Sequence, residues 1–348
     1  MHLQSFVLFR VLAISLVVLG HVRYISGWEA NTFIEKYLYM TFVEGGTFYF
    51  AFISGFLFQH IFVSNFNFRK YLEGKLKTIF LPYLFLSIVP ISVALITRNP
   101  YPDYFFYGDS GIYEDYIRPA LLYFFSGRVL TGYWYIPFIS LVFISSPLIV
   151  MFTSIRRCYQ VAILLILFFI SMLVHRPVDN MSPFQSYVYF IPVYLFGMFV
   201  SVNSNKIFEI FKDRLIYLLV ISLGLSFFVA YFIGEFGNRH KIFLSYEGLD
   251  FMVVQRSLMC IFYYVLFTRL SQIKSKWLNL FAGASFSIYF LHVWVIYIMN
   301  RVDINSIIGL PNFLYFILLF LFFMVLCVFS AYLVKKALGA RSRIFIGY

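Results

Sequence analysis

An arginine and a histidine stand inside the first apolar run, in the stretch "RVLAISLVVLGH" from Arg10 to His21. A guanidinium can hold an anion, and an imidazole can move a proton near neutral pH. Eleven positions at about 100° each fall within about 20° of three full turns, so the two residues share one helix face, about 16 Å apart along the axis. Because lipid satisfies neither group, we expect this face to look into the bundle, toward a polar cavity.

A second polar stripe follows in "FAGASFSIYFLHVWV", where Ser285, Tyr289 and His292 fall at positions i, i+4 and i+7. These three side chains share one face of a helix. Each stripe also has a structural interpretation. Arg10 can pair with a carboxylate or a helix end, His21 can lie at the membrane interface, and the second stripe can hydrogen-bond between helices.

Further basic residues lie at the ends of apolar runs. Arg256 begins the eighth run and can either pair with Glu44 or a loop acid, or contact a substrate. The loop "FRKYLEGKLKTIFLPY" carries Arg69, Lys75 and Lys77 beside the membrane. These cations can contact anionic lipid, or they can bind a phosphorylated ligand.

The composition is that of an integral membrane protein. Hydrophobic residues make up 62% of the 348 and charged residues only 12%, against about 25% charged in soluble domains. The three cysteines lack the paired spacing of a metal site, and neither a metal nor a permanently bound cofactor is expected. We predict an all-α, polytopic transmembrane helix bundle, one domain over residues 1–348, in which the short fifth and sixth spans can be tilted, kinked or partly re-entrant. The ten spans are 3–20, 47–63, 79–97, 133–153, 160–174, 187–201, 215–234, 252–270, 281–298 and 312–334.

The distribution of lysine and arginine predicts the topology. With the N-terminus inside, the cytoplasmic segments hold sixteen of the 27 basic residues, and both termini are cytoplasmic. The net charge of +12 is then mainly a topology signal and needs no nucleic-acid partner. The cytoplasmic segments are 64–78, 154–159, 202–214, 269–280 and 335–348.

Taken in order, these stretches resemble the acyltransferase-3 family of membrane acyltransferases, which modify sugars of bacterial surface glycans. The resemblance rests on "FRVLAISLVVLGH", "FYFAFISGFLF", the basic loop leading into "LPYLF", "YWYIPFISLVFISSPLI" and "FAGASFSIYFLH". It runs through nearly the whole chain, and the spans from the fifth to the eighth are the least anchored. Where the family often has two arginines three positions apart, this chain has Lys75 and Thr78, so the bidentate fork that arginine offers a phosphate is lost there.

The resemblance implies transfer of an acyl group, most commonly acetyl, from cytoplasmic acyl-CoA to a sugar hydroxyl. Acetyl-CoA is then a donor substrate, held by Arg69, Lys75 and Lys77, and the acceptor is a surface glycan or lipid-linked oligosaccharide. His21 is the expected general base, with an acyl-histidine intermediate as the alternative. Arg10 holds the donor or stabilises charge at the thioester oxygen. The residues expected around the acceptor or the cavity are Ser285, Tyr289, His292, Trp134 and Arg256.

Two other classes of function remain open at this point. A lipid-linked glycan flippase or other transporter has many spans and intramembrane cations. It predicts helix breaks and paired internal repeats, and the sequence shows no repeat. A glycan polymerase would place its polar residues in a large outer loop, for which 98–132 is the candidate. In every case we expect a multi-pass membrane protein in contact with lipid, and the resemblance implies that this membrane is the bacterial inner membrane.

Overall fold

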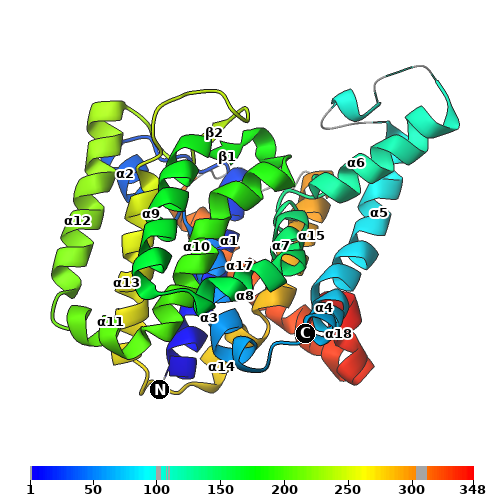
Figure 1. The fold of residues 1–348 in the computed structure, drawn as a ribbon. Helices are drawn as coiled ribbons and strands as arrows, with labels where there is room; N and C mark the ends of the chain where they lie inside the picture. The colour runs from blue at the N-terminus through cyan, green and yellow to red at the C-terminus, as the bar shows by residue number, and fades with distance from the viewer. Residues whose placement is uncertain (1, 99–102, 107, 109, 303–311) are drawn as a thin grey trace.

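In a computed structural model, described here for residues 2–98, 103–106, 108, 110–302 and 312–348, the chain forms a helix bundle (Figure 1). The first half contains α1 (His2–Ser26), α2 (Phe33–Phe42), α3 (Gly46–Ile61), α4 (Phe68–Lys75), α5 (Leu81–Thr97), α6 (Arg118–Ser126), α7 (Tyr135–Ile144), α8 (Ser146–Ser154) and α9 (Arg157–Val174). The second half contains α10 (Pro183–Val202), α11 (Ser204–Phe211), α12 (Leu215–Phe228), α13 (Met252–Arg269), α14 (Lys276–Gly283), α15 (Ser285–Val302), α17 (Phe313–Leu338) and α18 (Ser342–Ile346). The described residues contain only two short strands, β1 (Arg176–Pro177) and β2 (His240–Lys241), which confirms the all-α prediction.

Long apolar helices account for most of the expected spans. Two further spans come from helix pairs that are bent at short breaks, α7 with α8 by 59° and α14 with α15 by 67°. The described part of the chain therefore has seven candidate spans, or nine with the bent pairs. The seven are Gln4–Ser26, Phe33–Ile61, Phe68–Thr97, Arg157–Val174, Pro183–Val202, Leu215–Ile233 and Phe313–Ile346.

The sequence predicts about ten spans, and the structure has up to nine candidates among the described residues. The difference lies at α13, which covers the expected eighth span but is not a candidate. This helix buries Gln255 and Arg256 and packs against α1 and α12. A helix that is covered by protein can carry polar side chains that lipid would not tolerate. The breaks also differ from expectation, because the fifth and sixth spans are the unbroken helices α9 and α10. The first break instead precedes Pro147, which cannot continue the hydrogen bonding of α7.

The two ends of the bundle carry different elements. The N-terminus, the C-terminus and the short helices α4, α11, α14 and α18 lie at one end, and β1 and β2 lie at the other (Figure 1). The segments that the charge pattern assigns to the cytoplasm thus gather at one end. Which side of the membrane this end faces remains a prediction.

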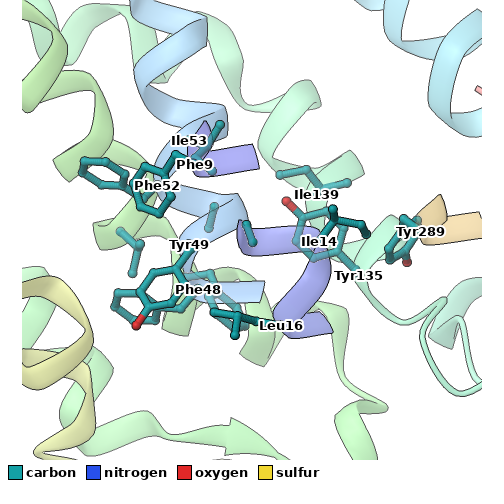
Figure 2. Packing of buried hydrophobic residues seen from close by; sticks show 14 of the residues in the cluster. Phe9, Ile14, Leu16, Phe48, Tyr49, Phe52, Ile53, Tyr135, Ile139 and Tyr289 are labelled. Carbon is teal, nitrogen blue, oxygen red and sulfur yellow. The ribbon is translucent and has the colours of Figure 1, made fainter. Parts of the chain in front are cut away.

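An aromatic core joins α1, α3 and α7 (Figure 2). Phe9 and Ile14 of α1 meet Phe52 of α3 and Tyr135 of α7 within this cluster. The rings of Phe9 and Phe52 lie 5.9 Å apart between centroids. This packing fixes how α1 is turned, and therefore which of its faces is available for polar chemistry.

Helices α3 and α10 approach each other through glycine. A Cβ added at Gly55 would overlap the backbone of Tyr194, and one at Gly197 would overlap the backbone of Phe52. Small residues permit this backbone contact, as they commonly do between membrane helices. Gly55 and Gly197 therefore let the two helices pack directly against each other.

Candidate functional site

The polar face of α1 is turned toward α15. The Arg10 Nη2 atom donates a hydrogen bond of 2.8 Å to the Ser285 hydroxyl. The ring centroids of His21 and His292 lie 5.2 Å apart, with 54° between the ring planes. Because the first pair meets near the start of α15 and the second pair further along both helices, α1 and α15 run parallel. The two polar stripes that the sequence indicated thus face each other.

The tautomer of His292 is set by its own helix. Its Nδ1 atom lies 2.9 Å from the Ile288 carbonyl oxygen, which can only accept a hydrogen bond. The neutral ring therefore carries its proton on Nδ1 and has a lone pair on Nε2. That Nε2 atom is buried and has no hydrogen-bond partner among the described residues. His292 thus offers a fixed acceptor in the neighbourhood of His21.

A glycine keeps space open beside His21. A Cβ at Gly132 would stand 3.7 Å from His21 Nε2 and 2.8 Å from a methyl carbon of Val293. The Gly132 carbonyl accepts a hydrogen bond of 2.6 Å from the Tyr289 hydroxyl. Tyr289 therefore anchors the segment before α7 against α15 and helps to hold this space in place.

His21 lies at the junction of two hollows. The larger is a cavity of about 640 Å³, whose wall includes His21, Trp134, Arg256 and other polar residues. The smaller is a pocket of about 20 Å³ on the side of Ser285 and Tyr289, which is roughly enough for one water molecule. His21 and Trp134 line both. A group bound in either hollow can therefore reach the same imidazole.

Trp134 and Arg256 both belong to the wall of the large cavity, each in a defined setting. The indole of Trp134 stacks on Phe190 at 6.0 Å between centroids and lies under the Arg176 guanidinium, 4.9 Å from its ring centre. The Arg256 side chain is 1% exposed, and its Nε atom donates a hydrogen bond of 3.1 Å to the backbone carbonyl of Glu44. The partner that the sequence suggested for Arg256 is thus contacted through its backbone.

The predicted donor-binding cations separate in the structure. Arg69 is an exposed residue that pairs with Glu73 at 3.1 Å, and Lys77 is also exposed. Lys75 instead points among the aromatic rings of Phe62, Tyr71 and Phe143, 5.1 to 5.4 Å from their centres. Its charge lies close enough to Arg10 for the two to repel each other. Among the described residues, Lys75 is thus the one of the three whose charge is turned into the protein, against these rings.

A π-helical turn, Leu76–Phe80, follows Lys75 directly. Such turns are rare in proteins overall, and those that occur are frequently found at functional sites. The Thr78 hydroxyl donates 2.9 Å to the Gly74 carbonyl within the helix. The Thr78 hydroxyl thus bonds to the backbone of its own helix. At this position the family often has an arginine, which this chain lacks.

The large cavity also contains residues that the sequence interpretation did not single out. Three of them come from the short segment "HRPVDN", residues 175–180. A cluster of polar residues in so short a loop between two apolar spans was the available signal. The missed residues are Arg128, Arg176, Asp179, Asn180, Asn238 and His240.

No curated protein and no solved structure matches the chain. A family model described as an acyltransferase domain, that of acyltransferase-3, matches residues 3–332, nearly the whole length. The match includes α1, α15 and the segments that form both hollows. The chain therefore belongs to the acyltransferase-3 family and is a membrane acyltransferase.

Proposed function

We propose that this protein transfers an acyl group, most simply acetyl, from acyl-CoA to a hydroxyl of a glycan sugar. The observation that carries the proposal is the position of His21, which lines both the large cavity and the narrow pocket beside Ser285. An imidazole at such a junction suits a reaction whose two substrates arrive from opposite directions. Membership of an acyltransferase family supports this function over a flippase, a transporter or a polymerase.

On the donor side, Arg69 and Lys77 are exposed on the end of the bundle that also holds the termini. We assign them a role in attracting the polyanionic nucleotide of acyl-CoA. Lys75 lies among aromatic rings and Arg10 lies against Ser285, and we assign these two cations to the path of the thioester end of the donor. Acyl-CoA is then a substrate, and no permanently bound cofactor takes part.

On the acceptor side, the large cavity takes the glycan or lipid-linked oligosaccharide. Trp134 and Arg256 line this cavity and shape it around the sugar. The His292 Nε2 lone pair and the Tyr289 anchor hold the acceptor hydroxyl or the His21 ring in position. With the N-terminus in the cytoplasm of a bacterial cell, the acceptor enters from the outer face of the inner membrane.

The chemistry follows from these positions. His21 takes the proton of the acceptor hydroxyl while its oxygen attacks the thioester carbonyl carbon. The new C–O bond forms, the C–S bond breaks, and the coenzyme A thiolate leaves with the proton from the histidinium. Arg10, already oriented by Ser285 at 2.8 Å, stabilises the negative charge on the carbonyl oxygen. General-base assistance of this kind contributes about 10²–10⁴-fold.

The test compares wild-type protein with His21→Asn, using purified full-length protein, labelled acetyl-CoA and glycan from a producing strain. We expect His21→Asn to bind acetyl-CoA normally and to lose at least 10²-fold in glycan acylation. His60→Asn is the matched control, because His60 is exposed and stacks on Phe56 away from both hollows. Normal acylation by His21→Asn contradicts the general-base role, and absence of acetyl-CoA binding by the wild type contradicts the function.

A further inference from the structure

Three guanidinium groups converge on the wall of the large cavity. Arg128 precedes α7, Arg176 lies on β1 and Arg256 lies in the first turns of α13, so three separate segments deliver them. Two carboxylates, Glu44 and Asp179, share the same wall. A volume of about 640 Å³ is within the range of small-molecule sites. The cavity is therefore large enough for a sugar and is lined by more cationic groups than a neutral sugar requires.

The carboxylates do not satisfy these arginines. Asp179 forms an ion pair of 3.5 Å with Arg128. Arg176 and Arg256 form no ion pair in the part of the chain that the structure describes. Arg256 approaches Glu44 through the backbone carbonyl rather than the carboxylate. Among the described residues, the guanidinium groups of Arg176 and Arg256 therefore lack a direct anionic partner.

A third carboxylate, Asp250, is fully buried behind the wall and does not line the cavity. One carboxylate oxygen of Asp250 accepts a hydrogen bond of 2.9 Å from the Tyr189 hydroxyl, and the other accepts one of 3.0 Å from the Met252 backbone amide. From its buried position, the negative charge of Asp250 reduces the positive potential that the arginines create in the cavity. It leaves the donor groups of the arginines available to a molecule in the cavity.

Arg176 is held rigidly and yet keeps a free donor. Its guanidinium stacks on Trp134 at 4.9 Å, and its Nη2 atom donates 3.0 Å to the Asn180 amide oxygen. The Nε atom is buried and has no partner among the described residues. Burial lowers the pKa of Arg176 to about 10, so the group remains charged at neutral pH. A stacked, pre-oriented guanidinium is suited to bidentate contact with an oxyanion.

Arg256 presents a second free donor. It is 1% exposed, and its Nη2 atom has no hydrogen-bond partner in the described structure. A buried donor that is left unsatisfied is destabilising, more so when it is charged, and calls for an explanation. A ligand oxyanion supplies the missing acceptor for both arginines.

The backbone around Arg176 is strained in the same place. His175, Asp179 and Asn180 have φ values of 54°, 52° and 57°, a conformation that side chains other than glycine seldom adopt. The strand pairing of Arg176 with His240 and a hydrogen bond from the Arg176 amide to the Arg239 carbonyl hold the segment. Strain of this kind clusters at ligand sites.

We propose that the large cavity binds an acceptor glycan that carries an oxyanion, a carboxylate or a phosphate of the sugar itself, between Arg176 and Arg256. This inference rests on the proposed function and narrows its acceptor to acidic glycans. Because His21 lines the same cavity, the reacting hydroxyl of the sugar then lies near the imidazole while the two arginines bind the charged group of the glycan. The pyrophosphate of a lipid carrier has the same chemistry and is separated by the experiment.

The experiment measures glycan binding to purified full-length protein with no acyl donor present. The probes are a hyaluronan tetrasaccharide, which carries carboxylates, and chitotetraose, which is neutral. We expect at least tenfold tighter binding of the anionic probe at low salt, with the advantage shrinking as salt is added. Equal affinities, tighter binding of chitotetraose, or binding of neither overturn the proposal.

A third probe, chitobiose on farnesyl pyrophosphate, identifies the source of the charge. A gain confined to this probe places the oxyanion in the lipid carrier and also overturns the proposal. Because no donor is present, the result is independent of the chemistry. Anionic binding without acyl transfer refutes the proposed function alone, whereas acyl transfer without anionic preference refutes this inference alone.

Variants locate the site. Arg176→Gln and Arg256→Gln should each remove about tenfold of the affinity for the anionic probe and so shrink its advantage over chitotetraose, and Arg176→Lys should retain part of that advantage. Arg301→Gln is the matched control, since Arg301 also stacks on an aromatic ring, Tyr297 at 5.4 Å, but lies outside the cavity wall. An anionic advantage that survives both glutamine variants contradicts the assignment. Wild-type binding decides the proposal even where a variant does not fold.

Discussion

Two helix pairs in this bundle meet in opposite ways. Helices α3 and α10 touch backbone to backbone, through Gly55 and Gly197, with no polar side chain between them at that point. Helices α1 and α15 instead meet through Arg10 with Ser285 and His21 with His292. The first pair uses the absence of side chains to hold the bundle together. The second pair uses side chains to keep polar groups, and space beside them, inside an apolar protein.

The largest expected effect breaks the first pair. Gly197→Leu places a side chain where even a Cβ would overlap the Phe52 backbone, so the destabilisation should exceed the roughly 1–3 kcal/mol of ordinary overpacking. We expect no monodisperse protein in size-exclusion chromatography. Gly224→Ala is the control, because nothing lies within 4 Å of its added Cβ. Wild-type yield from Gly197→Leu would refute the backbone contact.

The next effect removes the charge from the second pair. Arg10→Gln keeps a polar side chain near Ser285 and loses the guanidinium, so we expect acyl transfer to fall by about 10²–10³-fold while the protein still folds. Turnover of labelled acetyl-CoA measures this. Arg214→Gln is the matched control, since Arg214 lies beyond α11 and its side chain donates a hydrogen bond of 3.0 Å to the Ile210 carbonyl. Undiminished turnover by folded Arg10→Gln would remove the role of Arg10.

A smaller effect sharpens the same contact. Ser285→Ala leaves Arg10 charged but deletes its 2.8 Å hydrogen bond. A hydrogen bond to a charged group contributes about 1.5–3 kcal/mol, so catalytic efficiency should fall by at least tenfold and by less than in Arg10→Gln. Steady-state kinetics at varied acetyl-CoA concentration test the order of the two variants. Ser140→Ala, which loses only a bond to the Ile136 carbonyl of its own helix, should behave as wild type.

The smallest effect concerns the anchor beside the pair. Tyr289→Phe loses the 2.6 Å bond to the Gly132 carbonyl and keeps the ring. We expect about 1 kcal/mol of lost stability, with a fewfold drop in turnover because the segment beside His21 loosens. Thermal unfolding and turnover of the same preparation measure both. A change as large as that of Arg10→Gln would show that the Tyr289 hydroxyl does more than anchor.

The comparison also shows which features of the site can be predicted from the sequence. Helical periodicity places Arg10 and His21 on one face, and it places Ser285 and His292 on another, because both inferences need only local geometry. The contact between the two faces joins residues 275 positions apart, Arg10 with Ser285. No local pattern encodes that pairing. The shared family order of motifs indicated that these stretches belong together, but it gave no contact.

Other differences have local causes. Arg176 stands in a short loop that the charge pattern assigns to the outer side, where a basic residue is interpreted as a topology signal. The pairing of β1 with β2 helps to hold it at the cavity wall. The polar composition of α13 follows from its burial, which a count of apolar residues does not detect. The break between α14 and α15 falls beside Gly283, a small residue of a kind that packs closely as readily as it bends. Residues 99–102, 107 and 109 of the outer loop 98–132, which a polymerase would need, lie outside the described residues.

The two contacts between α1 and α15 also limit how the protein can move. They are eleven residues apart on α1 and seven apart on α15, so they correspond to about 16 Å and 10 Å of helix, and the long arginine side chain spans the difference. A slide of one helix along the other by a single turn, about 5.4 Å, would separate both pairs at once. The register of α1 on α15 is thus pinned at two points. A piston stroke of α1 along α15 would therefore break both contacts, whereas the cavity-lining segments 127–134 and 175–180 carry neither of them.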